Sequence, residues 1–336
     1  MLQGPSPALF LDTINAFQKT EALRAALELD LFTHAAAGKA TADELAAACG
    51  AHPRGVRILA DYLTVLGFLT KDDAGYAVTP DTRAFLARPS PAYMGGMVGF
   101  LLAPDIRDCF GKLTEAVRNG GTAHSAEGTV SHDNPVWVAF AREMGALMRL
   151  PAMLLAQLVN VDATKPLRIL DVAAGHGLFG LALAQPHPAA HVVALDWPNV
   201  LQVAEENARA AHMADRYALL PGSAFDVDWG GPYDLVLLTN FLHHFDMAAC
   251  EVIARKARAA LAPGGRCVTL EFVPNADRVS PPNTATFALT MLATTARGDA
   301  YTFAEYEQLF ARAGFARSTF HPLPPSAQQA VISYTE

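Results

Sequence analysis

The chain has 336 residues, of which 51% are hydrophobic and 17% charged, with a formal net charge of −8. The negative charge argues against a general nucleic-acid binder, which needs a positive field. No apolar run approaches the ~18 residues of a membrane span, and the N-terminus lacks a signal-peptide pattern. Cys49, Cys109, Cys250 and Cys267 are scattered and form no metal-ligand spacing. We therefore expect a cytoplasmic protein with reduced thiols.

The first 100 residues are expected to form a small, mainly helical domain. Apolar residues recur at helical spacing through 9–32 and 52–69. Between them, Thr41, Glu44 and Gly50 mark the beginning and end of a further helix. The stretch KDDAGYAVTP (71–80) then predicts a short hairpin. Three helices followed by a hairpin are typical of a winged helix.

A winged helix raises the alternative of a DNA-binding regulator. Residues 1–100 contain eight Lys or Arg and ten Asp or Glu, so this region is net negative. The predicted wing tip carries Asp72 and Asp73, which would repel a phosphate backbone. The charge pattern favours an interaction domain over a DNA reader.

Residues 101–160 are expected to form a helical connector. The sequence pattern then changes, and from about residue 161 apolar strands alternate with amphipathic helices. Strand candidates such as LRIL, VVAL, DLVLL and CVTL are continuously apolar, as strands buried on both faces are. This alternation predicts an α/β domain with a doubly wound parallel sheet, and two final strands (RSTFHPL and AVISYT) that could pair as a hairpin.

A glycine-rich turn follows the first strand of this domain, in LDVAAGHGLFG. Gly175, Gly177 and Gly180 fit the spacing of a dinucleotide-binding turn, so the glycines alone leave NAD open. Asp171 would face a pyrophosphate with a like charge, and it suits an amine-bearing ligand better. S-adenosylmethionine is such a ligand, because it carries an ammonium and a sulfonium and no phosphate. Asp196, at the end of the next strand, is suitably spaced to bind ribose hydroxyls.

The segments LDVAAGHG, VVALDWP, PGSAF, NFLHHF and LAPGGRCVTLEF together resemble a known family. They are similar to the S-adenosylmethionine-dependent O-methyltransferases with an N-terminal winged-helix dimerisation domain, as in caffeate and antibiotic O-methyltransferases. The resemblance covers nearly the whole chain. It implies a class I methyltransferase (Rossmann-like) sheet in 161–336, a connector that walls the substrate pocket in 101–160, and a winged-helix dimerisation domain in 1–100. It also implies a homodimer and S-adenosylmethionine as cofactor, with S-adenosylhomocysteine as product.

The resemblance places the catalytic base on His243, in VLLTNFLHHFD. A phenol is a poor nucleophile near neutral pH until it loses its proton, and an imidazole suits that task. Glu271, at the end of the next strand, matches the family acid that orients the base. The expected cofactor-binding residues are Asp171, Gly175, Gly177, Asp196, Trp197, Ser223, Ala224, Phe225 and Asn240.

An apolar, aromatic acceptor is expected from two sets of side chains at helical spacing. Phe140, Met144 and Met148 share one helix face, and Phe287 and Met291 repeat the spacing. In the family these regions wall the acceptor pocket, although core or dimer packing is the alternative for each side chain. His244 is added as a pocket residue. The expected reaction is O-methylation of an aromatic hydroxyl on a small, secondary-metabolite-like molecule.

Two positions depart from the family pattern. Ala300 stands where members have a second acid beside the base, and Thr239 replaces a lysine of the plant enzymes. These departures keep open a C- or S-methyltransferase that acts mainly by positioning. An enzyme that has lost methyl transfer is a further alternative. A metal site at His243 and His244 lacks a completing acid in the sequence, so no metal is expected.

Overall fold

The computed structural model describes residues 4–126, 128–129, 134, 136–162 and 164–336. Part of the predicted connector, residues 127, 130–133 and 135, lies outside the described residues. The chain divides into two compact units, Met1–Val98 and Gly99–Glu336. The predicted connector and catalytic regions therefore fall within one unit. No helix in the described ranges is long and apolar enough to cross a bilayer.

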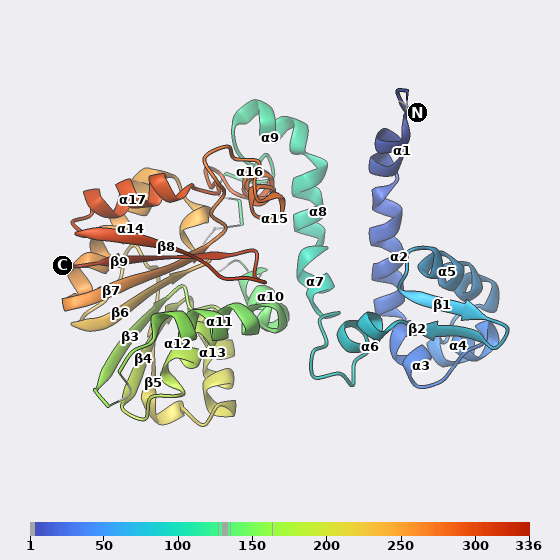
Figure 1. Ribbon diagram of the computed structural model, residues 1–336, viewed down its shortest axis with the longest axis horizontal. Helices are drawn as coiled ribbons and strands as arrows, with labels where there is room; N and C mark the ends of the chain where they lie inside the picture. The colour runs from blue at the N-terminus through green and yellow to red at the C-terminus, as the bar shows by residue number, and fades with distance from the viewer. Residues whose placement is uncertain (1–3, 127, 130–133, 135, 163) are drawn as a thin grey trace. The chain divides into compact units, whose positions relative to one another are not determined.

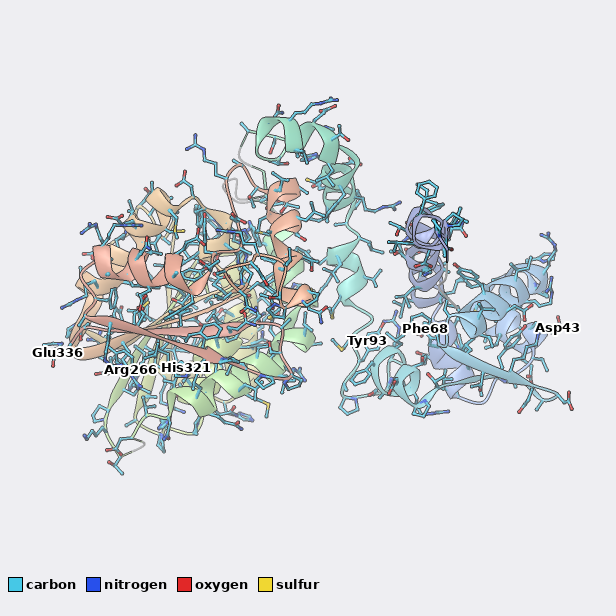
Figure 2. The ribbon with its side chains drawn as sticks, turned by 45° about the horizontal axis from the view of Figure 1, so that its top comes forward. Asp43, Phe68, Tyr93, Arg266, His321 and Glu336 are labelled. Atoms are coloured by element: carbon cyan, nitrogen blue, oxygen red, sulfur yellow. The ribbon has the colours of Figure 1, made fainter. Side chains whose placement is uncertain are left out.

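The N-terminal unit is helical with one small hairpin, as the sequence predicts (Figure 1). Its elements are α1 (Ala8–Ile14), α2 (Ala16–Glu28), α3 (Leu31–Ala36), α4 (Ala42–Cys49), α5 (Pro53–Val65), β1 (Leu69–Asp72), β2 (Gly75–Val78) and α6 (Pro80–Leu86). The Thr41 side chain accepts from Glu44 N and the Glu44 side chain accepts from Thr41 N, so α4 begins with a capping box. Gly50 ends α4 in the left-handed conformation. Phe68, labelled in Figure 2, packs against Phe32 in the core of this unit.

Helices precede the sheet of the C-terminal unit. They are α7 (Met97–Leu101), which crosses the boundary between the units, α8 (Pro104–Gly111), α9 (Leu113–Asn119), α10 (Val136–Glu143) and α11 (Gly145–Val159). The long amphipathic segment of 136–159 therefore divides at Met144. Hydrogen bonds from Met144 N to Phe140 O and from Met148 N to Met144 O continue the helical pattern across the junction. The three side chains consequently keep the shared face that their spacing predicts.

The sheet has seven strands in the order β5-β4-β3-β6-β7-β9-β8; β9 runs antiparallel to both β7 and β8, and the other neighbouring strands are parallel. The strands are β3 (Leu167–Val172), β4 (Ala190–Asp196), β5 (Tyr217–Pro221), β6 (Tyr233–Thr239), β7 (Leu261–Glu271), β8 (Arg317–Pro322) and β9 (Gln329–Tyr334). The predicted parallel sheet and final hairpin are both confirmed. Arg266 of β7 pairs with Tyr334 of β9, so Arg266 and the C-terminal Glu336 lie at the same end of the sheet (Figure 2).

The remaining helices cover this sheet and surround its carboxyl edge (Figure 1). They are α12 (Leu178–Ala184), α13 (Pro198–Ala210), α14 (Met247–Ala260), α15 (Pro282–Ala285), α16 (Phe287–Thr294) and α17 (Phe303–Arg312), with short 3₁₀ turns η1 (Ala214–Arg216) and η2 (Leu242–His244). Helices α12 and α13 pack against β3–β5, whereas α14 and α17 pack against β6–β9. Because β3, β4 and β6 are parallel, the loops after them meet at one edge, where ligands bind in open α/β sheets.

Candidate active site

A large cavity of about 920 Å³ opens at that edge, within the C-terminal unit. Its size is at the upper end of ordinary small-molecule sites. Most of the predicted site residues line it: Phe140, Met144, Met148, Gly175, Asp196, Trp197, Ser223, Ala224, Phe225, Asn240, His243, His244, Phe287 and Met291. Asp171, Gly177 and Glu271 are buried and are not among its lining residues. The structure thus brings together segments that are far apart in sequence, from α10 to α16.

The loop after β3 uses its two predicted glycines differently. Gly175 has φ +56° and lines the cavity, and an added Cβ would meet nothing closer than 3.7 Å. Glycine is therefore favoured at position 175 by the left-handed backbone rather than by a lack of space. Gly177 has φ +72°, and an added Cβ would lie 2.3 Å from the hydroxyl of Tyr217. Gly177 thus permits close packing between this loop and β5.

Asp171 is fully buried beneath the same loop. Its Oδ2 accepts a hydrogen bond of 3.0 Å from Gly180 N, near the start of α12, while its Oδ1 has no partner among the described residues. Burial raises the pKa of this carboxyl to about 7. Gly180 also lies too close to Asp171 for a side chain, since a Cβ would approach Oδ2 to 2.9 Å. The helix start that would hold a pyrophosphate is thus occupied by a carboxylate of the protein.

Asp196 ends β4 and faces the cavity from the other side of the loop. Its Oδ2 accepts from Gly175 N at 2.8 Å, and its Oδ1 accepts from Trp197 N at 2.7 Å. Burial raises its pKa to about 6. Each carboxylate oxygen has a second lone pair, so Asp196 retains capacity to accept from ligand hydroxyls.

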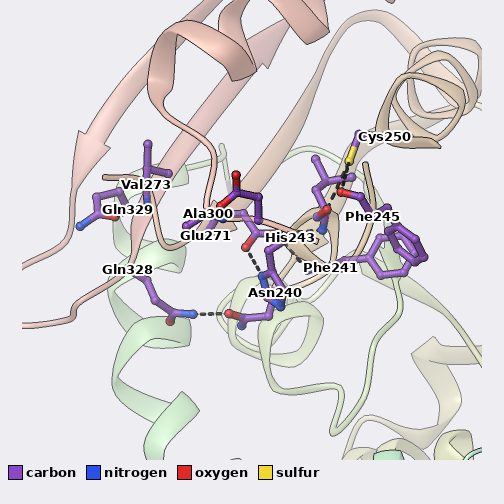
Figure 3. A network of polar contacts seen from close by, with 12 residues as sticks. Asn240, Phe241, His243, Phe245, Cys250, Glu271, Val273, Ala300, Gln328 and Gln329 are labelled. Atoms are coloured by element: carbon purple, nitrogen blue, oxygen red, sulfur yellow. Dashed lines mark hydrogen bonds and ion pairs between the residues drawn. The ribbon is translucent and has the colours of Figure 1, made fainter. Parts of the chain in front are cut away.

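His243 and Glu271 form the polar centre of the site (Figure 3). Glu271 ends β7, and its Oε2 contacts Nδ1 of His243. Its Oε1 accepts hydrogen bonds from Phe241 N and Leu242 N, at 2.9 and 2.8 Å. The carboxylate therefore fixes both the imidazole and the backbone that carries it. Nδ1 is occupied by Glu271, so Nε2 is the ring nitrogen that remains for a ligand.

The backbone of His243 is held from a second direction. Asp299 N donates to His243 O at 3.0 Å, and an added Cβ at Gly298 would lie 2.3 Å from the same carbonyl oxygen. Phe287 of α16 packs edge-on against the imidazole, with the ring centroids 4.8 Å apart. His243 is thus confined by β7, by the 295–300 loop and by α16.

His244 lines the cavity beside His243, with its ring 4.2 Å from that of His243. Burial, together with His243, lowers the pKa of His244 well below its usual value. Its Nδ1 is buried and has no partner in the described part of the chain. His244 therefore contributes a neutral ring to the wall. Within the described ranges, no group of three or more His, Cys, Asp or Glu side chains is placed to hold a metal ion.

The structure adds several lining residues that the sequence reasoning missed. His176, between the two glycines, stacks on Phe140, and burial lowers its pKa to about 4. Trp137 packs on His244, and Asp246 pairs with Arg297 at 3.1 Å. The GHG triplet was a usable signal for His176. The others had none, because their approach to the cavity depends on tertiary packing.

The charges around the cavity favour a cationic ligand. Asp196, Asp226 and Asp246 line it, and the only Lys or Arg side chain among its described lining residues is that of Arg297. Apolar side chains make up most of the rest of the wall. This combination fits S-adenosylmethionine, whose charged groups include a sulfonium and an ammonium. A dinucleotide would bring two phosphates to a wall that offers little positive charge.

Comparison with known sequences agrees with this site. The model of the O-methyltransferase domain family matches residues 110–316, and that of the O-methyltransferase dimerisation domain matches residues 11–88. Together these matches span both units of the chain.

Individual relatives cover nearly the full length. Acetylserotonin O-methyltransferase of Mus musculus is 30% identical over 324 residues, covering 91% of this chain and 83% of the relative. The 3-hydroxy-5-methyl-1-naphthoate 3-O-methyltransferase of Streptomyces sahachiroi is 30% identical over 314 residues, covering 92% and 89%. A crystal structure described as a putative O-methyltransferase from Nostoc punctiforme is 50% identical, with a TM-score of 0.95, covering 99% of this chain and 100% of that one.

Proposed function

The chain belongs to the S-adenosylmethionine-dependent O-methyltransferases with an N-terminal dimerisation domain, and on that premise we propose that it methylates an aromatic hydroxyl, with His243 as general base. The contact between His243 Nδ1 and Glu271 is the observation that carries this proposal. It leaves Nε2 to take the proton of the acceptor hydroxyl as the oxygen attacks. A positioned base of this kind contributes about 10²–10⁴-fold to a rate.

S-adenosylmethionine, when bound, supplies the methyl group on a sulfonium that leaves as a thioether. Asp196 is proposed to accept from the ribose hydroxyls, and Gly175 to let the backbone approach the methionine part. Trp197, Ser223, Ala224, Phe225 and Asn240 complete the proposed cofactor contacts from the loops after β4, β5 and β6. Asp171 and Gly177 act from behind the loop, by holding its shape.

The acceptor is proposed to be small, apolar and aromatic. Phe140, Met148, Phe287 and Met291 line the cavity, and Phe287 also stacks on Phe272, with their centroids 4.0 Å apart. Flat faces of this kind and adaptable methionines suit an aromatic ring. The names of the relatives from Mus musculus and Streptomyces sahachiroi point the same way, to acetylserotonin and a hydroxynaphthoate.

An acidic hydroxyl is the proposed nucleophile within this class. Ala300 is buried and does not line the cavity, and Asp299 beside it pairs with Arg278 at 3.5 Å. The family's second acid is therefore not replaced at this point. A hydroxyl that ionises readily needs less help from His243, whose only acidic partner in the described chain is Glu271.

The test compares the wild type with His243→Ala, each given S-adenosylmethionine and a pooled library of phenols, enols and thioethers. Mass spectrometry identifies acceptors that gain one methyl group. We expect methyl ethers from the wild type and a fall of about 10²-fold or more for the variant. His191→Ala, on an exposed side chain of β4, is the matched control and should keep the wild-type rate.

Calorimetry with S-adenosylhomocysteine separates binding from chemistry in the same variants. An unchanged affinity in His243→Ala would show that the site is intact and that the lost step is chemical. Equal rates in wild type and His243→Ala would instead refute the general base. Methylated enol carbons or sulfur atoms, without any methyl ether, would refute the choice of an oxygen acceptor.

We further propose a homodimer formed through the N-terminal unit, in the cytoplasm. Leu9, Phe10, Ile14 and Phe17 on α1 and α2 expose 58–80% of their surface, an apolar stripe that a partner would cover. Light scattering should give twice the chain mass for the wild type and a monomer for Phe10→Glu with Phe17→Glu. Val279→Glu, on an exposed residue of the C-terminal unit, should stay dimeric.

A further inference from the structure

Asn240 occupies a constrained position at the carboxyl end of β6. It has φ +54°, a left-handed conformation that asparagine adopts more readily than most residues, and its N–H donates to Leu270 O at 2.8 Å. Its side chain lines the cavity. The Nδ2 group has only the sulfur of Met148, at 3.7 Å, as a partner among the described residues. A thioether is a weak acceptor, so this donor remains available to a ligand oxygen.

Gln328 fixes which end of the Asn240 carboxamide faces the cavity (Figure 3). Gln328 precedes β9, and its Nε2 donates to Asn240 Oδ1. The amide of Asn240 is thereby oriented with its oxygen toward Gln328 and its N–H groups away from it. Gln328 itself does not line the cavity, so any effect on a ligand must pass through Asn240.

The arrangement is costly for stability alone. Gln328 is 2% exposed, and its Oε1 is buried without a hydrogen-bond partner in the described chain. An unpaired buried carbonyl costs about 1–3 kcal/mol. An apolar side chain would avoid that cost, so the glutamine is better explained by what its Nε2 does for Asn240.

The strand order indicates which part of the cofactor Asn240 meets. Asp196 ends β4 and Asn240 follows β6, on the two sides of β3. A cofactor whose ribose binds Asp196 therefore extends over β3 toward β6 with its methionine part. The carboxylate is the oxygen acceptor of that part, and Arg297, the only Lys or Arg side chain among the described lining residues, is already paired with Asp246.

We propose that Gln328 is a positioning residue for the cofactor, which holds the Asn240 carboxamide so that its N–H groups meet the methionine carboxylate of S-adenosylmethionine. The inference concerns cofactor binding only. It rests on the family's cofactor and on the proposed ribose contact of Asp196, and it is independent of the acceptor and of the role of His243. Its failure is thus distinguishable from a failure of the proposed reaction.

The first experiment measures two affinities by calorimetry, for S-adenosylhomocysteine and for 5′-methylthioadenosine, which lacks the amino-acid part. In Gln328→Met the affinity for S-adenosylhomocysteine should fall about tenfold, as expected for one lost hydrogen bond to a charged group. The affinity for 5′-methylthioadenosine should stay within about twofold of the wild type. Equal losses for both ligands, or no loss for either, would overturn the proposal.

Gln328→Glu tests the hydrogen bond through the pH dependence of ligand affinity, which a purely structural role of Gln328 would not change. A protonated glutamic acid can donate to Asn240 Oδ1, whereas the ionised form cannot. Relative to wild type at each pH, its affinity for S-adenosylhomocysteine should be near normal at acid pH and weaken as pH rises. If Gln328→Met does not fold, Gln328→Glu still tests the proposal. A constant ratio across pH would contradict the proposal.

Two further variants complete the design. Adding Asn240→Ala to Gln328→Met should weaken binding little beyond Asn240→Ala alone, because the two residues act in series. Gln329→Met is the matched control, since Gln329 is also a buried glutamine of this segment but bonds to Val273 N and Thr284 instead. It should alter thermal stability without changing the ratio of the two affinities. Additive losses in the double variant would argue against the series arrangement.

Discussion

The carboxyl ends of β3 and β7 each carry a fully buried carboxylate, and the two have different hydrogen-bond partners. Glu271 accepts from two backbone N–H groups and contacts His243. Asp171 accepts from one backbone N–H, and its second oxygen has no partner among the described residues. Burial alone therefore does not define the role of an acid. The hydrogen-bond donors around the acid decide whether it positions other groups or whether its ionised form destabilises the fold.

The difference also separates two kinds of preorganisation. Glu271 joins a strand end, the following loop and the proposed base into one hydrogen-bonded unit, so the imidazole is aligned before any ligand arrives. Asp171 shapes the glycine loop from beneath, and burial raises its pKa to about 7. The first acid is expected to govern the chemical step. The second is expected to govern stability and its dependence on pH.

The largest expected effect comes from removing the Glu271 carboxylate. Glu271→Leu leaves Phe241 N, Leu242 N and the His243 ring without their acceptor, and we expect the free energy of unfolding to fall by about 3–5 kcal/mol. Methyl transfer should be lost as well. Glu271→Gln retains an acceptor oxygen and should lose much less stability. Urea titration of both variants checks this, and equal losses would show that the hydrogen bonds matter less than the packing.

Asp171→Asn should change how stability depends on pH. The folded-state pKa is raised from 3.8 to about 7, so the folded state binds more protons than the unfolded state between these values. Stability therefore falls as pH rises through this window, by at most about 4 kcal/mol for a shift of about three units. The amide of the variant cannot ionise, so the variant should lose less stability between about pH 4 and 8. If the stability of the two proteins changed with pH in the same way, Asp171 would not have the raised pKa on which this prediction depends.

The two glycines of the β3 loop should respond unequally to alanine. Gly177→Ala adds a clash with Tyr217 to an unfavourable φ, and we expect a loss of about 2–3 kcal/mol. Gly175→Ala has room for its Cβ and should lose about 1 kcal/mol, but it should weaken S-adenosylhomocysteine binding. Thermal unfolding and calorimetry on both variants test the contrast. The opposite order of stability would mean that the loop is held from the cavity side.

The smallest effect is expected at His244. His244→Phe replaces a neutral ring by an apolar ring of similar size, so stability should change by less than about 1 kcal/mol. The pKa of His244 lies well below its usual value, and the acid limb of the pH–activity profile should therefore be unchanged. A shifted acid limb would show that this ring takes part in proton transfer.

Local patterns in the sequence were sufficient to predict which regions are helical and which are strands, but not the helix boundaries. The predicted helical stretch 9–32, for example, falls on three helices, α1, α2 and α3. Continuous apolar runs predicted the parallel strands, and Thr41 with Glu44 predicted a cap that the structure contains. The carboxyl edge of the sheet followed from strand direction. The shared helix face of Phe140, Met144 and Met148 followed from their spacing, which continues across the junction at Met144, whereas their place in the cavity wall followed from the family resemblance.

What could not be predicted depends on contacts between distant segments. Gln328 reaches Asn240 across 88 residues, and nothing in its neighbourhood marks it as different from Gln329. Asp171 and Gly177 remain predicted cofactor contacts; neither lines the cavity, and nothing in the sequence indicated that they would pack against Gly180 and Tyr217. A glycine motif gives the backbone shape, but only the fold shows which side of the loop requires it.

The close approach of Gly298 to the carbonyl of His243 limits how this enzyme can diversify. A side chain at position 298 would push on the backbone of the proposed base and on Thr295. Its neighbour Arg297, at the cavity wall, is mostly exposed and free of that restriction. If His243 acts as proposed, exchanges at position 297 and along α16 can alter acceptor preference, whereas a side chain at position 298 would displace His243 itself. Adjacent positions of one loop thus differ in evolvability.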